Sequence, residues 1–259
     1  MSEITTLQTR LATGLIALAF LFEGRVSGSE PADFLPRGSS RPLLRASDPL
    51  GVVGQARLMG RGPVVGYYQP VAITGPEGVR FSLPHVGNPS PSGMTVPAQR
   101  LEAGFLIGSV YRFQVTHIPG ALGVELFPTV EVIDRTYPPQ HLVTRYPIEI
   151  QLDDEDFQTA LRGQMVTRVI YLEDPQTAIP QLQNPKTNVP LEISEFQDPL
   201  AVADEYGRPV AIVRIGSLTP PSQPSLLPEF YFGYPQWAPF PHASASQNAN
   251  QDKVPSELE

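Results

Sequence analysis

Short runs in which apolar and polar residues alternate, each closed by glycine or proline, dominate the central stretch 105–172. Apolar side chains occupy every second position from 111 to 115, which is the period of a half-buried β-strand. A Gly/Pro break at 119–123 separates this run from a second alternating run at 124–134, so the two predict an antiparallel hairpin. Pro128 has no N–H for a central ladder, so the second strand is predicted to lie at a sheet edge or to carry a bulge.

The same pattern recurs on both sides of this stretch. Further strands are predicted at 52–58, 64–73, 79–83, 146–152 and 165–172, and a last hairpin is predicted with arms at 200–202 and 209–215 around a turn at 204–208. Gly207 is expected to supply a positive φ in that turn. Two proline-rich stretches, 84–99 and 176–198, are expected to be irregular. Short strands at this spacing predict a mainly β fold, an antiparallel Ig-like sandwich or an open barrel with one short α-helix.

That one helix is predicted to follow Asp153 or Asp154 and to end at Gly163. The acidic run 153–156 supplies a cap and places negative charge at the positive end of the helix dipole. Phe157 and Leu161 lie on one face, and a helix of about ten residues needs such a face to pack against a sheet. The same acidic run could be interpreted as a cation site, but consecutive residues do not converge on one ion, so the helix start is favoured.

The composition excludes several classes of catalytic and binding site. The 259 residues include no cysteine, which excludes disulfides, thiol catalysis and Cys-ligated metals. The net charge of -8 argues against nucleic-acid binding, which needs a basic surface. The four histidines are far apart without metal-ligand spacing, and neither a nucleotide-binding glycine pattern nor a Gly-x-Ser-x-Gly motif is present. We therefore expect no cofactor, no metal and no nucleic-acid partner.

Four segments make up the predicted organisation. Residues 1–28 are typical of a secretory signal, because Arg10 precedes the apolar run 11–22 and small residues follow it. Twelve helical residues span about 18 Å, too little for a bilayer, so no integral span is expected after signal removal. Residues 29–48 are expected to be a flexible linker and 49–218 the β domain. Residues 219–259 form a Pro/aromatic-rich tail whose polar end is expected to be disordered.

The tail carries the candidate binding residues. Six aromatic side chains gather among prolines within eleven positions: Phe230, Tyr231, Phe232, Tyr234, Trp237 and Phe240. Such a group either folds back over an open edge of the β domain or forms an exposed patch for a protein or glycan partner. The edge-covering hypothesis is favoured. It predicts that loss of the tail lowers the melting temperature, whereas the exposed-patch hypothesis predicts no change.

The sequence offers no strong catalytic constellation. Retaining glycosidases need two carboxyl groups about 5 Å apart, and Glu125, Glu131 or Asp134 could supply such a pair on the second hairpin strand. A polysaccharide-acting hydrolase is therefore the alternative hypothesis. Carboxylates that project from a surface strand are a common structural feature, so no catalytic residue is assigned.

Several segments resemble those of uncharacterised exported proteins of planctomycete bacteria. The segments that carry the resemblance are 124–132, 165–174 and 206–212, and the similarity would cover roughly residues 50–218. The resemblance implies export and brings no activity or functional residue with it.

Together these features predict an exported protein of the cell envelope, periplasm or medium. Its expected role is non-catalytic: binding a protein or a glycan through loops and tail. A purely structural assembly subunit is a third hypothesis.

Overall fold

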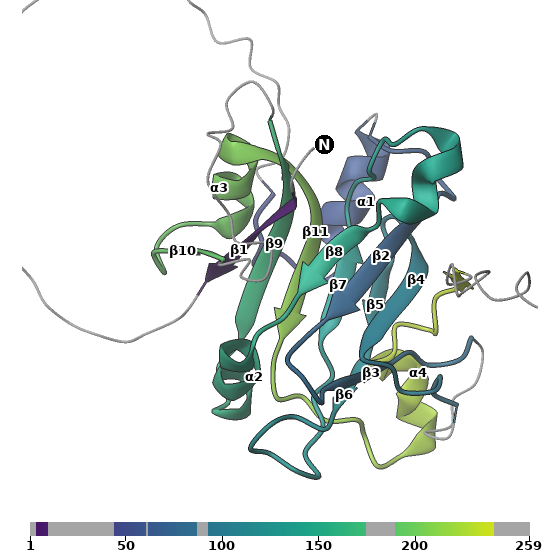
Figure 1. The fold of residues 1–259 in the computed structure, drawn as a ribbon, viewed down its shortest axis with the longest axis vertical. Coiled ribbons are helices and arrows are strands. Elements are labelled where there is room, and N and C mark those ends of the chain that lie inside the picture. Colours follow the sequence, from purple (N-terminus) through teal and green to yellow (C-terminus); the bar gives the residue numbers. More distant parts are fainter. Residues whose placement is uncertain (1–3, 10–43, 61, 87–92, 175–189, 241–259) are drawn as a thin grey trace, which may run out of the picture.

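The computed structural model describes residues 4–9, 44–60, 62–86, 93–174 and 190–240. In these ranges two sheets pack face to face and enclose the main core (Figure 1). The six-stranded sheet has the order β10 (Leu191–Ile193), β1 (Ile4–Thr9), β9 (Val166–Glu173), β11 (Gly207–Ile215), β7 (Thr129–Val132) and β5 (Val110–Arg112). The four-stranded sheet has the order β12 (Trp237–Pro239), β4 (Arg100–Leu106), β2 (Tyr68–Thr74) and β8 (Ile148–Gln151). A small third sheet pairs β3 (Arg80–Ser82) with β6 (Gln114–Thr116).

Strand pairing is antiparallel except for β1 with β10 and β2 with β8. The fold is therefore mainly β, as the alternating runs predict, and the strands expected near 68–73, 80–82, 148–151 and 166–172 are confirmed. Strand β4, which links the two sheets through a turn to β5, is an element that the alternation did not reveal.

Two apolar layers hold the structure together. The main core lies between the sheets and includes Ile73, Phe105, Phe113, Ile150 and Ile170, all at most 2% exposed. A second cluster lies on the outer face of β9 and β11, where helix α3 (Pro199–Tyr206) and residue Ala46 pack against it. Strands β9 and β11 are thus buried on both faces, as their near-continuous apolar sequences require.

The predicted hairpin at 111–134 is confirmed in outline. The prediction that its second strand lies at a sheet edge is wrong. Strand β5 pairs with β7, and Val115 bridges to Leu126. However, β7 lies inside the six-stranded sheet, between β11 and β5. Pro128 is tolerated because β7 begins one residue after it, at Thr129, and the carbonyl of Pro128 accepts the N–H of Phe113.

The strand predicted at 52–58 is in fact helix α1 (Val52–Met59). The carboxylate of Glu131, far away in the sequence, accepts the N–H groups of Gly51 and Gly54 at 3.1 and 2.7 Å. It thereby satisfies amides at the start of the helix, which a strand would not present together. The hydrophobic periodicity of residues 52–58 does not indicate that Glu131 binds these amides.

The predicted hairpin at 200–215 is also wrong in its first arm, which forms α3. Asp198 caps this helix by accepting the N–H of Ala201, and Pro199 stands at the first helical position. Gly207 has a φ of 171°, which is ordinary extended backbone, so it does not supply a positive φ. Glycine is needed there because a Cβ would lie 2.0 Å from the carbonyl oxygen of Leu172 on β9.

The predicted helix at 153–163 is confirmed as α2 (Asp154–Leu161). Asp153 and Asp156 form a reciprocal capping box, and Phe157 is fully buried against the core. It is not the only helix, because the described residues also contain α1, α3, the short α4 (Leu227–Phe230) and two 3-10 segments, η1 (Gln140–Arg145) and η2 (Pro224–Leu226).

Several expectations fall partly or wholly outside the described residues. Within the predicted signal 1–28, residues Ile4–Thr9 form β1, and 10–28 lie outside the described ranges. The same holds for 29–43 of the linker, for 87–92 and 175–189 of the proline-rich stretches, and for the polar end of the tail from 241 onward. The export signal and the disordered tail stay predictions.

Candidate functional site

The aromatic tail segment lies against the four-stranded sheet and the β3–β6 region (Figure 1). We call residues 224–240 the C-terminal strap. It consists of η2, α4 and, after a turn, β12, which pairs antiparallel with β4 from Trp237 opposite Phe105 to Pro239 opposite Ala103. The strap therefore covers the edge that β4 would otherwise expose.

Hydrogen bonds fix the strap at its far end. The hydroxyl of Tyr111 accepts the N–H of Leu106 at 2.8 Å and donates to the carbonyl of Gln236 at 2.6 Å. Burial raises the pKa of Tyr111 to about 12, so the hydroxyl keeps its proton at neutral pH. The indole N–H of Trp237 donates to the carbonyl of Pro84 at 3.0 Å.

A separate aromatic cluster holds the first half of the strap. Phe230 contacts Phe127 edge-on with ring centroids 5.5 Å apart, and Tyr231 and Tyr234 stack at 5.4 Å. Leu227 completes the buried group, and Met94 packs against it. Burial raises the pKa of Tyr231 to about 12, so this ring enters the cluster in its neutral form.

Arg112 connects this cluster to strand β5. Its guanidinium carbon lies 4.1 Å from the ring centroid of Phe230 and 5.0 Å from that of Phe232, and its Nη1 donates to the carbonyl of Phe230 at 2.8 Å. The side chain is buried, and its Nε has no hydrogen-bond partner. Desolvation lowers the pKa of Arg112, so the two aromatic faces stabilise a cation that burial disfavours.

The turn between α4 and β12 has an uncommon backbone. Phe232, Gly233 and Tyr234 all have positive φ, at 53°, 74° and 54°. Two of them are not glycine, and L-residues with side chains rarely adopt this conformation. The N–H of Gly233 donates to the carbonyl of Pro228 at 2.7 Å, which helps to hold the turn.

The six predicted binding residues are therefore divided between the aromatic cluster and the β12–β4 pairing, with most of their surface packed. Phe230, Tyr231 and Tyr234 are buried, and Phe232, Trp237 and Phe240 are half-buried. A Cβ on Gly104 of β4 would lie 2.8 Å from the ring of Phe240. Glycine at this position therefore leaves room for the ring. A partner-binding role for these six residues stays a prediction.

The three carboxylates considered for hydrolysis lie in three different environments. Glu131 is fully buried and is engaged by two backbone amides and by Arg214, whose Nη1 lies 3.3 Å from its Oε2. Asp134 accepts a hydrogen bond from Arg208 at 3.0 Å, and Glu125 is exposed on the loop before β7. A buried, fully engaged Glu131 has no access to a glycan, so this geometry does not favour the hydrolase hypothesis.

Two buried arginines explain why acidic residues are buried on strand β7 and helix α2. Arg214 donates to the carbonyls of Ala46 and Asp48 as well as to Glu131, and so fixes the segment that leads into α1. Arg168 binds Asp156 through two contacts of 2.9 and 2.7 Å. These carboxylates are structural ion-pair partners.

Asp156, at the start of α2, is fully buried. Burial raises its pKa to about 6, while the charge of Arg168 and the N–H of Asp153 act in the opposite direction. The acidic run at the start of α2 thus serves the helix and its attachment to β9, as the capping pattern predicts.

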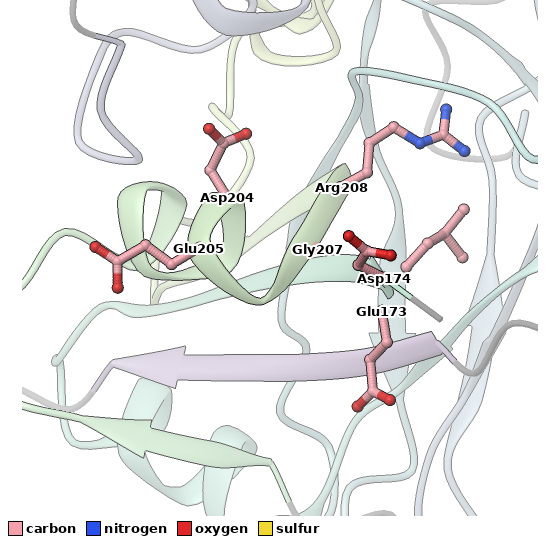
Figure 2. A pocket seen from close by; sticks show the side chains of 7 residues that line it. Glu173, Asp174, Asp204, Glu205, Gly207 and Arg208 are labelled. Atoms are coloured by element: carbon pink, nitrogen blue, oxygen red, sulfur yellow. The ribbon is translucent and has the colours of Figure 1, made fainter. Parts of the chain in front are cut away.

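An open depression of about 420 Å³ lies where β9 ends and β11 begins. Figure 2 shows four acidic side chains around it: Glu173, Asp174, Asp204 and Glu205. Their carboxylates point in different directions, and Arg208 on the opposite side is directed away from them, toward Asp134 (Figure 2). In the described part of the chain no three His, Cys, Asp or Glu residues converge as metal ligands.

In the described ranges no histidine belongs to a group of metal ligands. His85, His117 and His141 are exposed, and His117 has a positive φ of 57° with its Nδ1 2.9 Å from the hydroxyl of Thr116. His242 lies outside the described residues. A hydrogen-bonded structural role for His117 fits this local contact.

Comparisons with protein-family models, curated proteins and solved structures give no match to the chain. The proposed likeness to planctomycete exported proteins thus stays a prediction. Across the described residues, no helix has the length and apolar character that crossing a bilayer requires.

Sequence reasoning missed the residues that organise the strap and the ion pairs, Arg112, Arg168 and Arg214. A signal was present for Arg168 and Arg214, because each stands within a short apolar strand where a cation is costly unless it is paired, whereas Arg112 stands at a polar position of an alternating strand. The partners of Arg112 and Arg214 were not readable, since they lie 118 and 83 positions away in the sequence, whereas Asp156 lies only 12 positions before Arg168.

Proposed function

We propose that this chain is an exported, non-catalytic binding protein of the cell envelope or periplasm, and that its partner is a protein. The observation that carries the proposal is an aliphatic surface on α1 and the loop that follows it. Its members are Val52, Met59, Val64 and Val65, which are 42, 84, 60 and 75% exposed.

These four residues belong to one local unit. Val52 and Met59 are seven residues apart on α1 and so share one side of the helix. The N–H of Gly62 donates to the carbonyl of Arg57, which turns the following loop back toward the helix end. All four exposed apolar side chains fall within residues 52–65, and exposed apolar patches mark protein contacts more often than isolated side chains do.

The packing of the aromatic strap supports a protein over a glycan. Glycan sites rely on open aromatic faces, whereas three of the six strap aromatics are buried and three are half-buried. Aliphatic side chains offer little to a sugar ring, and they suit the apolar centre of a protein interface.

Export and binding are tested separately. Export predicts that N-terminal sequencing of the protein from the envelope fraction reads a chain without residues 1–28. Recovery of the full chain from the cytosol would contradict it.

Binding is tested with a photoreactive amino acid at position 64 in growing cells. We expect one specific cross-linked product, which the substitution Val65→Asp abolishes. Leu122, 88% exposed on a loop near β6, is the matched control, because β6 and α1 lie toward opposite ends of the molecule (Figure 1). If Leu122→Asp reduced the product as much as Val65→Asp does, the aliphatic surface would not be the binding site.

A further inference from the structure

Strand β1 occupies an interior position in the six-stranded sheet. It pairs antiparallel with β9 along its whole length, from Ile4 opposite Leu172 to Thr9 opposite Thr167, and parallel with β10. Figure 1 shows it as the purple arrow beside β9. The place between β9 and β10 therefore accepts an extended segment with main-chain pairing on both sides.

This strand lies within the segment that export would remove. Loss of residues 1–28 takes β1 away and leaves β9, a strand of eight residues, with one unpaired edge. It also leaves β10 without its strand neighbour, because β10 is joined to the sheet through β1. An unpaired edge of this length is a template for another strand.

We call the place that β1 leaves between β9 and β10 the slot. Apolar residues on both faces of β9 line it. Val169 and Tyr171 belong to the cluster under α3, while Ile170 and Leu172 belong to the main core. A new strand beside β9 would continue both apolar layers, with the side chains opposite Val169 and Tyr171 on the α3 face. Such a slot favours β-branched and apolar residues over charged ones.

The chain's own neighbouring segments are poorly suited to refill it. An interior strand needs N–H donors toward both neighbours, and proline has none. Prolines at 31, 36 and 42 interrupt the segment 29–43, and prolines at 175, 180 and 185 interrupt 175–189, so neither holds six consecutive residues without proline. The proline-free part of the tail, 242–254, consists mostly of Ala, Ser, Asn and Gln, which have little strand preference.

We propose that, in the processed protein, the slot between β9 and β10 binds an extended segment of another protein in place of β1. The inserted strand runs antiparallel to β9 and parallel to β10, spans about six residues without proline, and presents apolar or β-branched side chains opposite Val169 and Tyr171. This inference rests on the proposed export and adds a second contact to the aliphatic surface on α1.

The test uses processed protein from the envelope fraction and, for comparison, the full chain expressed without export. The probe is a labelled synthetic peptide with the sequence of residues 3–10, followed by fluorescence anisotropy. We expect saturable binding to the processed protein and binding at least tenfold weaker to the full chain, where β1 already fills the slot. The matched peptide with Thr6→Pro should not bind, because proline removes a central N–H donor.

Register is tested by disulfide trapping, since the chain has no cysteine of its own. A processed Thr167→Cys variant should form a disulfide with a peptide carrying Thr9→Cys, the residue opposite it in β1, much faster than with one carrying Gln8→Cys. Equal rates for the two peptides would contradict the antiparallel register.

The outcomes separate the two proposals. Processed protein that does not bind the peptide of residues 3–10 overturns the strand-acceptor site and leaves the export proposal standing. Processed protein that forms a dimer, and binds the peptide only as the dimer dissociates, assigns the slot to a second copy and overturns the partner. Unprocessed protein as the native form overturns both, because β1 then stays in the slot permanently.

Discussion

The carboxylate of Glu131, on strand β7, accepts the backbone N–H of Gly54, on helix α1, at 2.7 Å across 77 positions of sequence. The same side chain accepts the N–H of Gly51 and receives Arg214. One buried acid thus joins the start of a helix to the centre of the larger sheet. It also fixes the position of α1, on which the aliphatic surface depends.

Replacing Glu131 with alanine should be strongly destabilising. The change leaves Arg214 buried without its carboxylate and two N–H groups at the helix start without an acceptor. Removal of one partner from a buried ion pair costs about 3–5 kcal/mol. Urea denaturation measures this loss, and Glu125→Ala, at an exposed position, serves as the control that should change stability by less than about 0.5 kcal/mol. Similar values for the two variants would show that the Glu131 network contributes little.

Loss of the Tyr111 hydroxyl should loosen the end of the strap without disturbing the core. In Tyr111→Phe the ring still stacks on Phe105 at 4.3 Å, but the N–H of Leu106 and the carbonyl of Gln236 lose their partner. We expect a loss of about 1–3 kcal/mol in unfolding free energy. Tyr68→Phe is the matched control, because its hydroxyl contacts Gln236 only at 3.4 Å and the side chain is half-buried. An equal loss in both variants would contradict the special role of Tyr111.

An element could be predicted from the sequence when the residues that stabilise it lie close together in the chain. Helix α2 was predictable because its capping residues, Asp153 and Asp156, lie three positions apart and its apolar face follows at once. Helix α1 was not, because the residue that satisfies its first amides is Glu131. Periodicity alone could not separate a helix from a strand there.

The same distinction applies to the candidate site. The aromatic composition of the strap was visible, but the surface on which it packs is contributed by Met94, Arg112 and Phe127, more than 90 positions earlier in the chain. Arg112 stands at a polar position of an alternating strand, which normally indicates exposure. The strap buries it instead, and no local pattern records that contact.

Deleting the strap should lower the melting temperature and promote association. A chain that ends at residue 223 loses the aromatic cluster around Phe127 and exposes the edge of β4. We expect the melting temperature to fall by at least about 5 °C, since 1 kcal/mol corresponds to roughly 2–4 °C in a domain of this size. A chain that ends at Phe240 keeps every strap contact described above and should melt like the full protein. Scanning calorimetry with light scattering distinguishes the two, and an unchanged melting temperature after removal of the strap would contradict its covering role.

Protonation of Asp156 should make the wild type more stable in acid than at neutral pH, when each is compared with an Asp156→Asn variant. Burial raises its folded-state pKa from 3.8 to about 6, so between these values the folded chain holds a proton that the unfolded chain has released. The stability that this proton contributes is present below pH 4 and is lost as pH rises through 6, to a total of about 3 kcal/mol. Asp156→Asn cannot titrate, so the unfolding free energy of the wild type minus that of the variant should fall by most of this amount between pH 4 and pH 7. Denaturation series at both pH values measure the difference. A difference that rises with pH would show that Arg168 keeps Asp156 ionised despite its burial.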